Sequence, residues 1–449
     1  MTTTATKHVA FSLRAWREPD PGAAWTLAFF RLGFGLLMCL SLLRFAGKGW
    51  IYELYVLPKV YFPFYGFEWV KPLPEPLMYA AFGLLVLFSL GIALGFYYRF
   101  SAVAFFLLFT YVELIDKTNY LNHYYFISLA AFLLIFLPAH AVASFDARAG
   151  RVRQAVRRYH YLALLLQVGS VYFFAGIAKI KPDWLLHAQP LRIWLQANND
   201  IPLIGPLLEQ EITAYLASWA GMLFDISIPF LLLWKRTRVP AYVLVVFFHI
   251  CTGVLFNIGM FPYIMMFAAL VFFPQEQHRR WLQPLRFLWG TQFSLPVPGK
   301  APVLSYLLLP FFLLQILLPF RYLLYPGDPF ITEEGFRFSW NVMLMEKNGI
   351  CEFRVHDPRS GRDHIVYPSE WLSKQQERMM SSQPDMILQF AHMLAEAEKA
   401  RGNAAPEVYA QCYVAVNGRG SRVLIDPHTN LAAEKESFYH KKWIRSDEP

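Results

Sequence analysis

The stretch Ala24–Phe45, AWTLAFFRLGFGLLMCLSLLRF, decides the fold class of this chain. It is almost free of charge, and it is long enough to cross a bilayer, which takes about 20 mostly apolar residues. Eight further apolar runs follow, so we expect an α-helical polytopic membrane protein with about nine transmembrane helices. These runs are Leu77–Phe96, Ser101–Ile115, Tyr120–Val142, Tyr161–Ile180, Ala214–Trp234, Val239–Phe256, Met260–Phe273 and Leu304–Leu324.

The composition agrees with a membrane protein. Of the 449 residues 16% are charged and 56% are hydrophobic, whereas a soluble chain carries roughly 25% charged residues. The net charge of +9 comes from short Lys and Arg clusters between apolar runs, so it does not indicate nucleic-acid binding. The chain has 4 cysteines, which are too few for a disulfide scaffold and have no C-x-x-C spacing.

The basic residues also predict the orientation in the membrane. The sides that we assign to the cytoplasm hold Lys7, Arg14, Arg17, Arg99, Arg148, Arg151, Arg153, Arg157, Arg158, Lys235, Arg236, Arg238, Arg279, Arg280, Arg286 and Lys300. The opposite loops hold only Lys48, Lys59, Lys71, Lys117, Lys179, Lys181 and Arg192. By the positive-inside rule the N-terminus is cytoplasmic, and nine crossings place the C-terminus outside. In a bacterium the membrane would be the inner membrane.

Residues 325–449 have the character of a small α+β domain, which this orientation makes extracytoplasmic. Alternating side chains in Cys351–Val355 and Gln411–Val416 predict strands, and Ser369–Ala400 predicts one or two amphipathic helices. Cys351 and Cys412 fall in the predicted strands on the oxidising side. Either a disulfide or two reduced packing cysteines fit the sequence, because strand pairing cannot be read from it.

Ionisable residues in or beside the membrane spans mark candidate functional sites, because burying them in lipid is costly. The candidates are the polar segment Asp116–His123, Lys179, Asp225 and His249. Each has a structural alternative: a polar turn for the segment, an amine that reaches the interface for Lys179, and a packing residue for His249. Asp225 would then be the partner of a histidine, a tyrosine or Arg31.

The helical spacing around Lys179 adds detail. Tyr172 lies seven residues earlier and therefore on the same helix face, and Gly176 allows the close approach of a helix or a ligand. The sequence has no HExxH, GxSxG, P-loop or GxGxxG motif, and neither His123 nor His249 has ligands at metal spacing. The pattern alone favours a membrane enzyme without a metal, or a binder of a lipid-soluble ligand.

Several segments, in order and with similar spacing from about Pro21 to about Asp426, resemble the vitamin K-dependent γ-glutamyl carboxylase family. They are Tyr97–Phe100, Tyr111-Val112, Asp116–His123, Tyr172–Lys179, Asp183-Trp184, Phe248-His249, Leu255–Phe261, Phe338–Met343 and Ile425–Pro427. The resemblance implies a bacterial-type short homologue, with an HTTM-like transmembrane domain over residues 1–324 and an extracytoplasmic domain over residues 325–449.

The resemblance also implies the chemistry. The family oxygenates a reduced vitamin K, a phylloquinol or menaquinol, with O2 to the 2,3-epoxide, and this step drives γ-carboxylation of peptidyl glutamate with CO2. The implied activity is that of a peptidyl-glutamate 4-carboxylase, a carbon–carbon lyase that needs no metal. The implied partners are the lipid bilayer and a secreted protein that contains glutamate.

By this resemblance Lys179 is the base that deprotonates the quinol, and His123 with Asn122 serves the glutamate half of the reaction. His249, Tyr172 and Met343 are expected to bind the quinol. An ordinary lysine is protonated at neutral pH, with a pKa of about 10.4. We expect an apolar pocket to favour the neutral amine.

The chain departs from the animal pattern in ways that bear on carboxylation. Leu121 replaces an asparagine, Phe338 replaces a tyrosine, and Met393 lies near the place of a disulfide cysteine. The long C-terminal region that grips the propeptide of clotting-factor precursors has no counterpart. Two alternatives therefore stay open: a quinol epoxidase without carboxylation, and a non-catalytic membrane protein that binds quinone or lipid.

Overall fold

The structure is a computed structural model that describes residues 18–290 and 306–445. Six of its helices are long and apolar enough to cross a membrane. They are α2 (Ala23–Gly47), α4 (Glu75–Leu94), α5 (Tyr98–Ile115), α8 (Arg158–Ala178), α12 (Glu211–Leu233) and α13 (Arg238–Leu255). Lys7, Arg14, Arg17, Lys300 and Leu304 of the sequence predictions lie outside the described residues.

The other three predicted spans are shorter apolar helices. They are α6 (Asn122–Phe136), α14 (Phe261–Ala269) continued by η2 (Leu270–Phe272), and α17 (Leu308–Leu317) continued by η5 (Leu318–Leu324). The sequence predicts that the first of them extends to Val142, but α6 ends at Phe136 because the residue before Pro138 is disfavoured in helical conformation. The prediction of a helical membrane region is confirmed.

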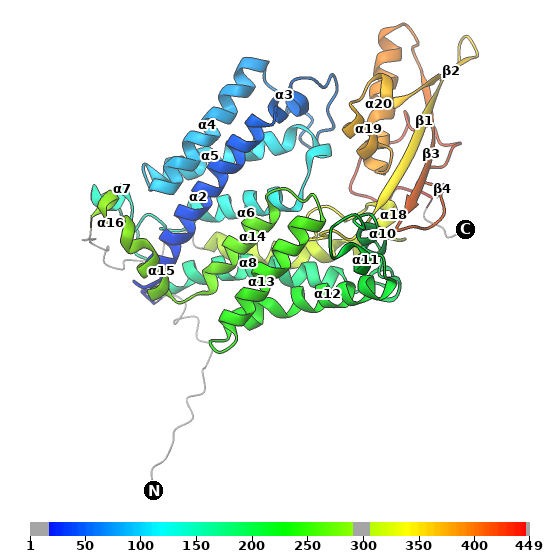
Figure 1. The fold of residues 1–449 in the computed structure, drawn as a ribbon. Helices are drawn as coiled ribbons and strands as arrows, with labels where there is room; N and C mark the ends of the chain where they lie inside the picture. Colours follow the sequence, from blue (N-terminus) through cyan, green and yellow to red (C-terminus); the bar gives the residue numbers. More distant parts are fainter. Residues whose placement is uncertain (1–17, 291–305, 446–449) are drawn as a thin grey trace.

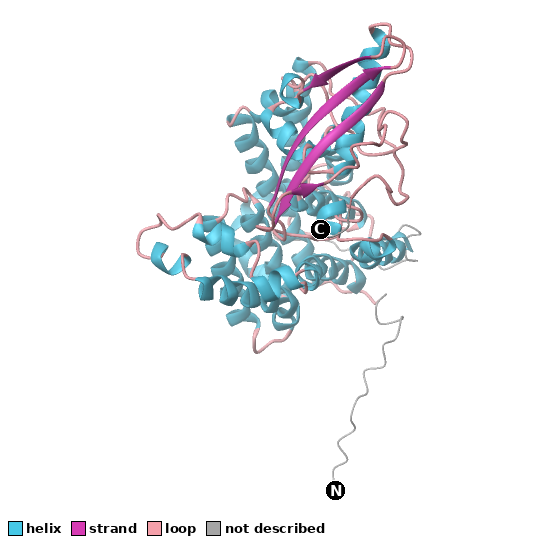
Figure 2. Ribbon diagram, turned by 90° about the vertical axis from the view of Figure 1, so that its right-hand side faces the viewer, coloured by secondary structure: helices cyan, strands magenta, loops and turns pink. Residues whose placement is uncertain are grey.

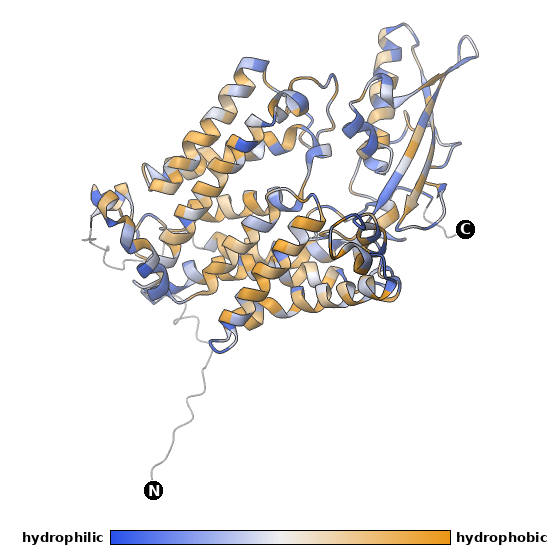
Figure 3. Cartoon of the chain, viewed as in Figure 1, coloured by the Kyte–Doolittle hydropathy of each residue, from blue (hydrophilic) through white to orange (hydrophobic). Residues whose placement is uncertain are grey.

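Short helices connect the long ones, and most apolar residues gather along the spans, as Figure 3 shows. The connecting elements of the membrane part are α3 (Trp50–Tyr55), η1 (Lys117–Asn119), α7 (Phe145–Arg148), α9 (Pro182–His187), α10 (Leu191–Gln196), α11 (Gly205–Leu208), α15 (Gln275–Leu282), η3 (Gln283–Leu285) and α16 (Arg286–Trp289). Two more short helices, α18 (Pro329–Thr332) and η6 (Pro368–Glu370), belong to the C-terminal part.

Arg31 is fully buried in α2 although it is charged. Its guanidinium donates to the carbonyls of Ile92 at 2.7 Å and Ala93 at 2.5 Å, close to the end of α4. It also donates to the carbonyls of Ala139 and Ala143. Cations stabilise helix C-termini, so this residue ties α2 to α4 and is not the partner of Asp225.

The C-terminal part contains an antiparallel sheet in the order β2-β1-β3-β4 (Figure 2). The strands are β1 (Lys347–Asp357), β2 (Arg362–Val366), β3 (Glu407–Val416) and β4 (Arg422–Val423), and the helices are α19 (Lys374–Met380) and α20 (Pro384–Ala400). Cys351 and Cys412 lie opposite each other in the β1·β3 register and form a disulfide. The predicted α+β domain is confirmed.

Charged side chains connect this domain to the membrane helices. Lys117 lies 2.8 Å from Asp385, which also accepts from Arg337 at 2.7 Å, and Gln376 donates to Asp116 at 2.9 Å. Burial would raise the pKa of Asp385, but Arg337 and Lys117 hold it well below its usual value. The network fixes the sheet domain beside one end of the helical bundle (Figure 1).

The hydrophobic core crosses the same junction. Trp184, Leu191 and Met222 of the helical part pack in one buried cluster with Phe353 and Phe390 of the sheet domain. The domain boundary after residue 324 therefore stays a prediction, because buried side chains from both sides of it share one core.

Candidate functional site

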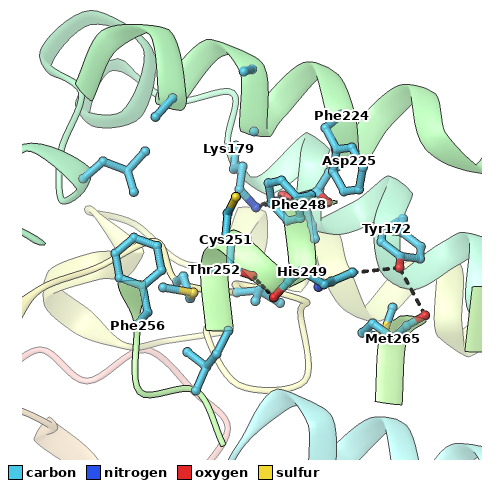
Figure 4. A pocket seen from close by; sticks show the side chains of 18 of the residues that line it. Tyr172, Lys179, Phe224, Asp225, Phe248, His249, Cys251, Thr252, Phe256 and Met265 are labelled. Atoms are coloured by element: carbon cyan, nitrogen blue, oxygen red, sulfur yellow. Dashed lines mark hydrogen bonds and ion pairs between the residues drawn. The ribbon is translucent and has the colours of Figure 1, made fainter. Parts of the chain in front are cut away.

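A cavity of about 460 Å³ lies between α8, α12, α13 and α14 (Figure 4). Four of the predicted site residues line it, namely Lys179, Tyr172, His249 and Met343. The other walls are mostly apolar and include Phe224, Phe248, Phe256, Phe261 and Met265. Its volume is typical of sites for small organic ligands, which measure about 300–1,000 Å³.

Lys179 lies at the C-terminal end of α8 and is only 5% exposed. Its Nζ lies 2.7 Å from Oδ2 of Asp225 and donates to the carbonyl of Ala175 at 3.2 Å. Figure 4 shows the two charged groups facing each other from α8 and α12. The sequence predicts a purely apolar pocket around Lys179, and this prediction is wrong, because the pocket contains the carboxylate of Asp225.

Gly176 explains why these two groups meet. A Cβ at this position would lie 2.7 Å from the backbone nitrogen of Ile226 and 3.1 Å from the carbonyl carbon of Asp225. No real side chain fits at such distances, so only glycine lets α8 approach α12 this closely. The sequence predicts that a helix or a ligand lies close to Gly176, and the structure places the helix α12 there. This close contact brings Lys179 within reach of Asp225.

A second polar pair lies deeper in the same cavity. The hydroxyl of Tyr172 lies 2.9 Å from Nε2 of His249 and 3.4 Å from the carbonyl of Met265. His249 is 1% exposed, and its Nδ1 has no hydrogen-bond partner among the described residues. A buried polar atom normally has a partner, so this nitrogen is an exception in the wall of the cavity.

The cavity reaches the lipid-facing surface of the bundle. The rings of Phe224 and Phe248 stack at 4.1 Å inside it. Leu223, Leu244 and Phe247 also line it, and they are 56%, 43% and 64% exposed on the membrane helices α12 and α13. The cavity therefore borders the apolar outer faces of these two helices.

A separate cavity of about 340 Å³ contains the remaining predicted residues, Asn122 and His123. It also contains Arg44 from the last turn of α2. The two cavities share a wall made of Ile258, Phe261, Val342 and Met343. The ring of Phe261 lies 6.1 Å from His123 and 5.9 Å from His249, so it stands between the two histidines.

Backbone strain marks the segment that supplies part of this wall. Phe338, Trp340 and Met343 have φ of 62°, 55° and 53°, which side chains other than glycine rarely adopt. The segment is held against the membrane part, because Asn122 donates to the carbonyl of Asn341 at 3.1 Å. Such strain persists only where surrounding contacts enforce it, and it is common at functional sites.

Comparison with known families covers nearly the whole chain. The HTTM domain matches residues 19–277, and the lumenal domain of vitamin K-dependent gamma-carboxylases matches residues 300–448. The chain belongs to the vitamin K-dependent gamma-carboxylase family. It is a multi-pass membrane protein with a lumenal-type C-terminal domain. No solved structure matches this member of the family.

In this family member the structure separates the predicted residues into two groups. Lys179, Tyr172 and His249 share one cavity, Asn122 and His123 share the other, and Met343 borders both. Lys181 lines a different cavity, and its Nζ lies 4.2 Å from the centre of the Phe330 ring. It is not placed to act with Lys179.

The sequence did not reveal three features of this site. Asp225 was recognised as a buried carboxylate, but its pairing with Lys179 was not predicted. Arg44 does not stand out in the sequence, and Phe261 appears only within a family-like segment, because a cation at the end of a span and a phenylalanine within one are ordinary in a membrane protein. Within residues 18–290 and 306–445, no group of three His, Cys, Asp or Glu is arranged to hold a metal.

Proposed function

We propose that the chain is a membrane enzyme that couples oxygenation of a reduced vitamin K-type naphthoquinol to γ-carboxylation of peptidyl glutamate. The observation that carries the proposal is the buried Lys179–Asp225 pair at the edge of an apolar cavity that opens toward lipid. Family membership supports the same activity.

The residues of the larger cavity suit a naphthoquinol. Aromatic walls fit its ring system, and the opening beside Leu244 and Phe247 fits an isoprenoid tail that extends into the bilayer. We assign His249 and the Lys179 amine, which both line the cavity, to its two oxygens. When bound, the quinol reacts with O2, supplies a base strong enough for the γ-hydrogen of glutamate, and leaves as its 2,3-epoxide.

Lys179 and Asp225 act together as the first proton acceptor in this proposal. Transfer of one proton from the ammonium to the carboxylate, across the 2.7 Å contact, leaves an amine lone pair. The amine then takes the hydroxyl proton of the quinol, and the pair becomes positively charged as the quinolate becomes negative. A cavity with little water strengthens the attraction between these charges.

His123 and Asn122 serve the glutamate side from the smaller cavity. His123 is 8% exposed and contacts the rings of Tyr124 and Phe261, and the described residues give its imidazole no hydrogen bond. It is therefore available to a glutamate side chain or to CO2. Phe261 and Met343 border both cavities, and removal of the γ-proton requires the quinol-derived base to contact the glutamate γ-carbon past these two side chains.

One observation favours the alternative of an epoxidase without carboxylation. The side-chain amide of Asn122 is already engaged, because its Oδ1 accepts from Tyr120 at 3.2 Å and its Nδ2 donates to Asn341. Leu121 supplies no second amide. We favour carboxylation because Arg44 and His123 line the smaller cavity.

Two products measured on the same samples test the proposal. Purified protein receives the reduced quinol, air, ¹⁴CO2 and a glutamate-containing peptide. The proposed enzyme forms both the 2,3-epoxide and acid-stable ¹⁴C in the peptide. Epoxide without fixed ¹⁴C would establish the epoxidase, and the absence of both would leave only a binding protein.

We also propose that the N-terminus is cytoplasmic and that the sheet domain is extracytoplasmic. The basic loops and the Cys351–Cys412 disulfide, which suits an oxidising compartment, support this orientation. A phosphatase reporter that works only outside the cytoplasm should be active when fused after Arg445. Activity only when it is fused after Arg153 would reverse the topology.

A further inference from the structure

We infer that Arg44 is the carboxylate-binding residue of the smaller cavity, and that its ligand is an acidic side chain of a peptide that enters from the surface. The inference rests on the proposed function, since it names the group that holds the glutamate substrate. It adds a residue that neither the sequence motifs nor the family comparison singles out.

Arg44 is a half-buried cation without an anionic partner. Among the described residues no carboxylate lies within 4.0 Å of its guanidinium, and its Cζ lies over the Trp50 ring, 5.2 Å from the ring centre. Glu113 and Arg44 both lie close enough to Tyr124 to act on its charge, but Glu113 makes no ion pair with Arg44. A cation–π contact does not use up the N–H donors of a guanidinium, so they can bind a ligand.

The cavity around Arg44 selects for an anion. No acidic residue lines it, and Arg44 is the one side chain in its lining that is always charged. The planar fork of arginine matches a carboxylate in a two-point hydrogen bond. A glutamate held in this way keeps its γ-carbon in the smaller cavity near His123, next to the wall that this cavity shares with the larger one.

The cavity is also open to a peptide. Leu121, which lines it, is 45% exposed, and Asn257 and Gly259 on the connection between α13 and α14 are exposed as well. These residues belong to the same end of the helical bundle as the start of α6. A chain segment can therefore reach Arg44 without passing through the lipid-facing opening that we assign to the quinol.

Lys48, the C-cap residue of α2 four positions after Arg44, provides a matched comparison with Arg44. It contacts the same Trp50 ring at 4.8 Å, but it is exposed and does not line the cavity. A cation at the end of a span often does no more than place its charge in the interface. Lys48 fits that description, whereas Arg44 lines the smaller cavity.

The test uses the purified full-length protein and a fluorescent hexapeptide that contains one glutamate, with its glutamine counterpart as the control ligand. Binding is measured by anisotropy, and the KM of the glutamate peptide is measured from fixed ¹⁴CO2. Arg44→Gln should weaken glutamate-peptide binding roughly 10- to 100-fold, as expected for a lost charge-assisted hydrogen bond. Arg44→Lys should keep part of the affinity, and Lys48→Gln should bind like the wild type.

Equal affinity of the wild type for the glutamate and glutamine peptides would overturn the inference. Wild-type affinity in Arg44→Gln would overturn it too, and Arg44→Lys guards against a variant that fails to fold. Epoxide formation by the wild type without peptide reports on the proposed function separately. Loss of glutamate selectivity in Arg44→Gln supports the site even if no epoxide is formed.

Discussion

The pairing of Lys179 with Asp225 makes a prediction that a double-mutant cycle can measure. At 2.7 Å and an effective dielectric constant of about 20, the Coulomb attraction is about 6 kcal/mol. Desolvation offsets much of this, because the side chains are only 6% and 8% exposed. Lys179→Met or Asp225→Asn alone should therefore cost about 3–5 kcal/mol of unfolding free energy, since each removes one partner of the buried pair.

The double variant removes both charges, so it should lose less than the sum of the single variants. We expect a coupling energy of about 1–3 kcal/mol, measured by unfolding in mixed detergent micelles. Strict additivity would show that the two groups do not interact. Lys235→Met with Asp225→Asn is the control cycle, because Lys235 is exposed just beyond the C-terminal end of α12.

The same variants decide how the lysine becomes a base. If Asp225 takes the proton of the ammonium, Asp225→Asn should lower epoxide formation by about 10²–10⁴-fold, as the loss of a general base does. If burial alone keeps the amine neutral, the loss of a nearby carboxylate should preserve or increase the rate. Wild-type or faster epoxide formation by Asp225→Asn would refute the paired base.

Three further predictions concern the site and the junction with the sheet domain. Gly176→Ala should separate α8 from α12 at Ile226, destabilise the protein by about 1–3 kcal/mol and lower epoxide formation. Gly83→Ala is the control and should have none of these effects, because a Cβ there meets open space. Ala220→Trp, at the exposed edge of the larger cavity, should slow turnover of a long-tailed menaquinol more than that of tail-free menadiol, and equal effects would place the entrance elsewhere. The lowered pKa of Asp385 means that its stabilising contribution is complete above about pH 4 and is lost as the pH falls further. Asp385→Asn should therefore lower the melting temperature at pH 7 and flatten its decline in acid, and parallel melting curves would contradict this.

The membrane architecture could be predicted because lipid requires long apolar helices wherever the chain crosses it. The run from Ala24 to Phe45 carries that signal by itself. The end of the fourth span was less certain, because apolar residues continue to Val142 beyond the end of α6. The position of Pro138 decides that end, through the backbone and not through hydropathy.

The candidate site was only half visible in the sequence. Lys179 and Asp225 stood out as costly charges in membrane helices, but their contact depends on how α8 and α12 rotate and on the missing Cβ of Gly176. Arg44 did not stand out, because its cavity is formed by segments far apart in the chain, such as Trp50, Asn122 and Met343. A cavity formed by segments that are far apart in the chain leaves no periodic pattern in the sequence.

The most direct test of the account measures epoxide and fixed ¹⁴CO2 in parallel in Lys179→Ala and His123→Ala. It asks whether the larger cavity carries quinol oxygenation and the smaller cavity carries carboxylation. Lys179→Ala should lose both products, because carboxylation depends on the oxygenated quinol. His123→Ala should lose fixed ¹⁴CO2 more than epoxide, so that oxygen consumption becomes uncoupled from carboxylation. Wild-type epoxide from Lys179→Ala, or equal loss of both products in His123→Ala, would contradict the division.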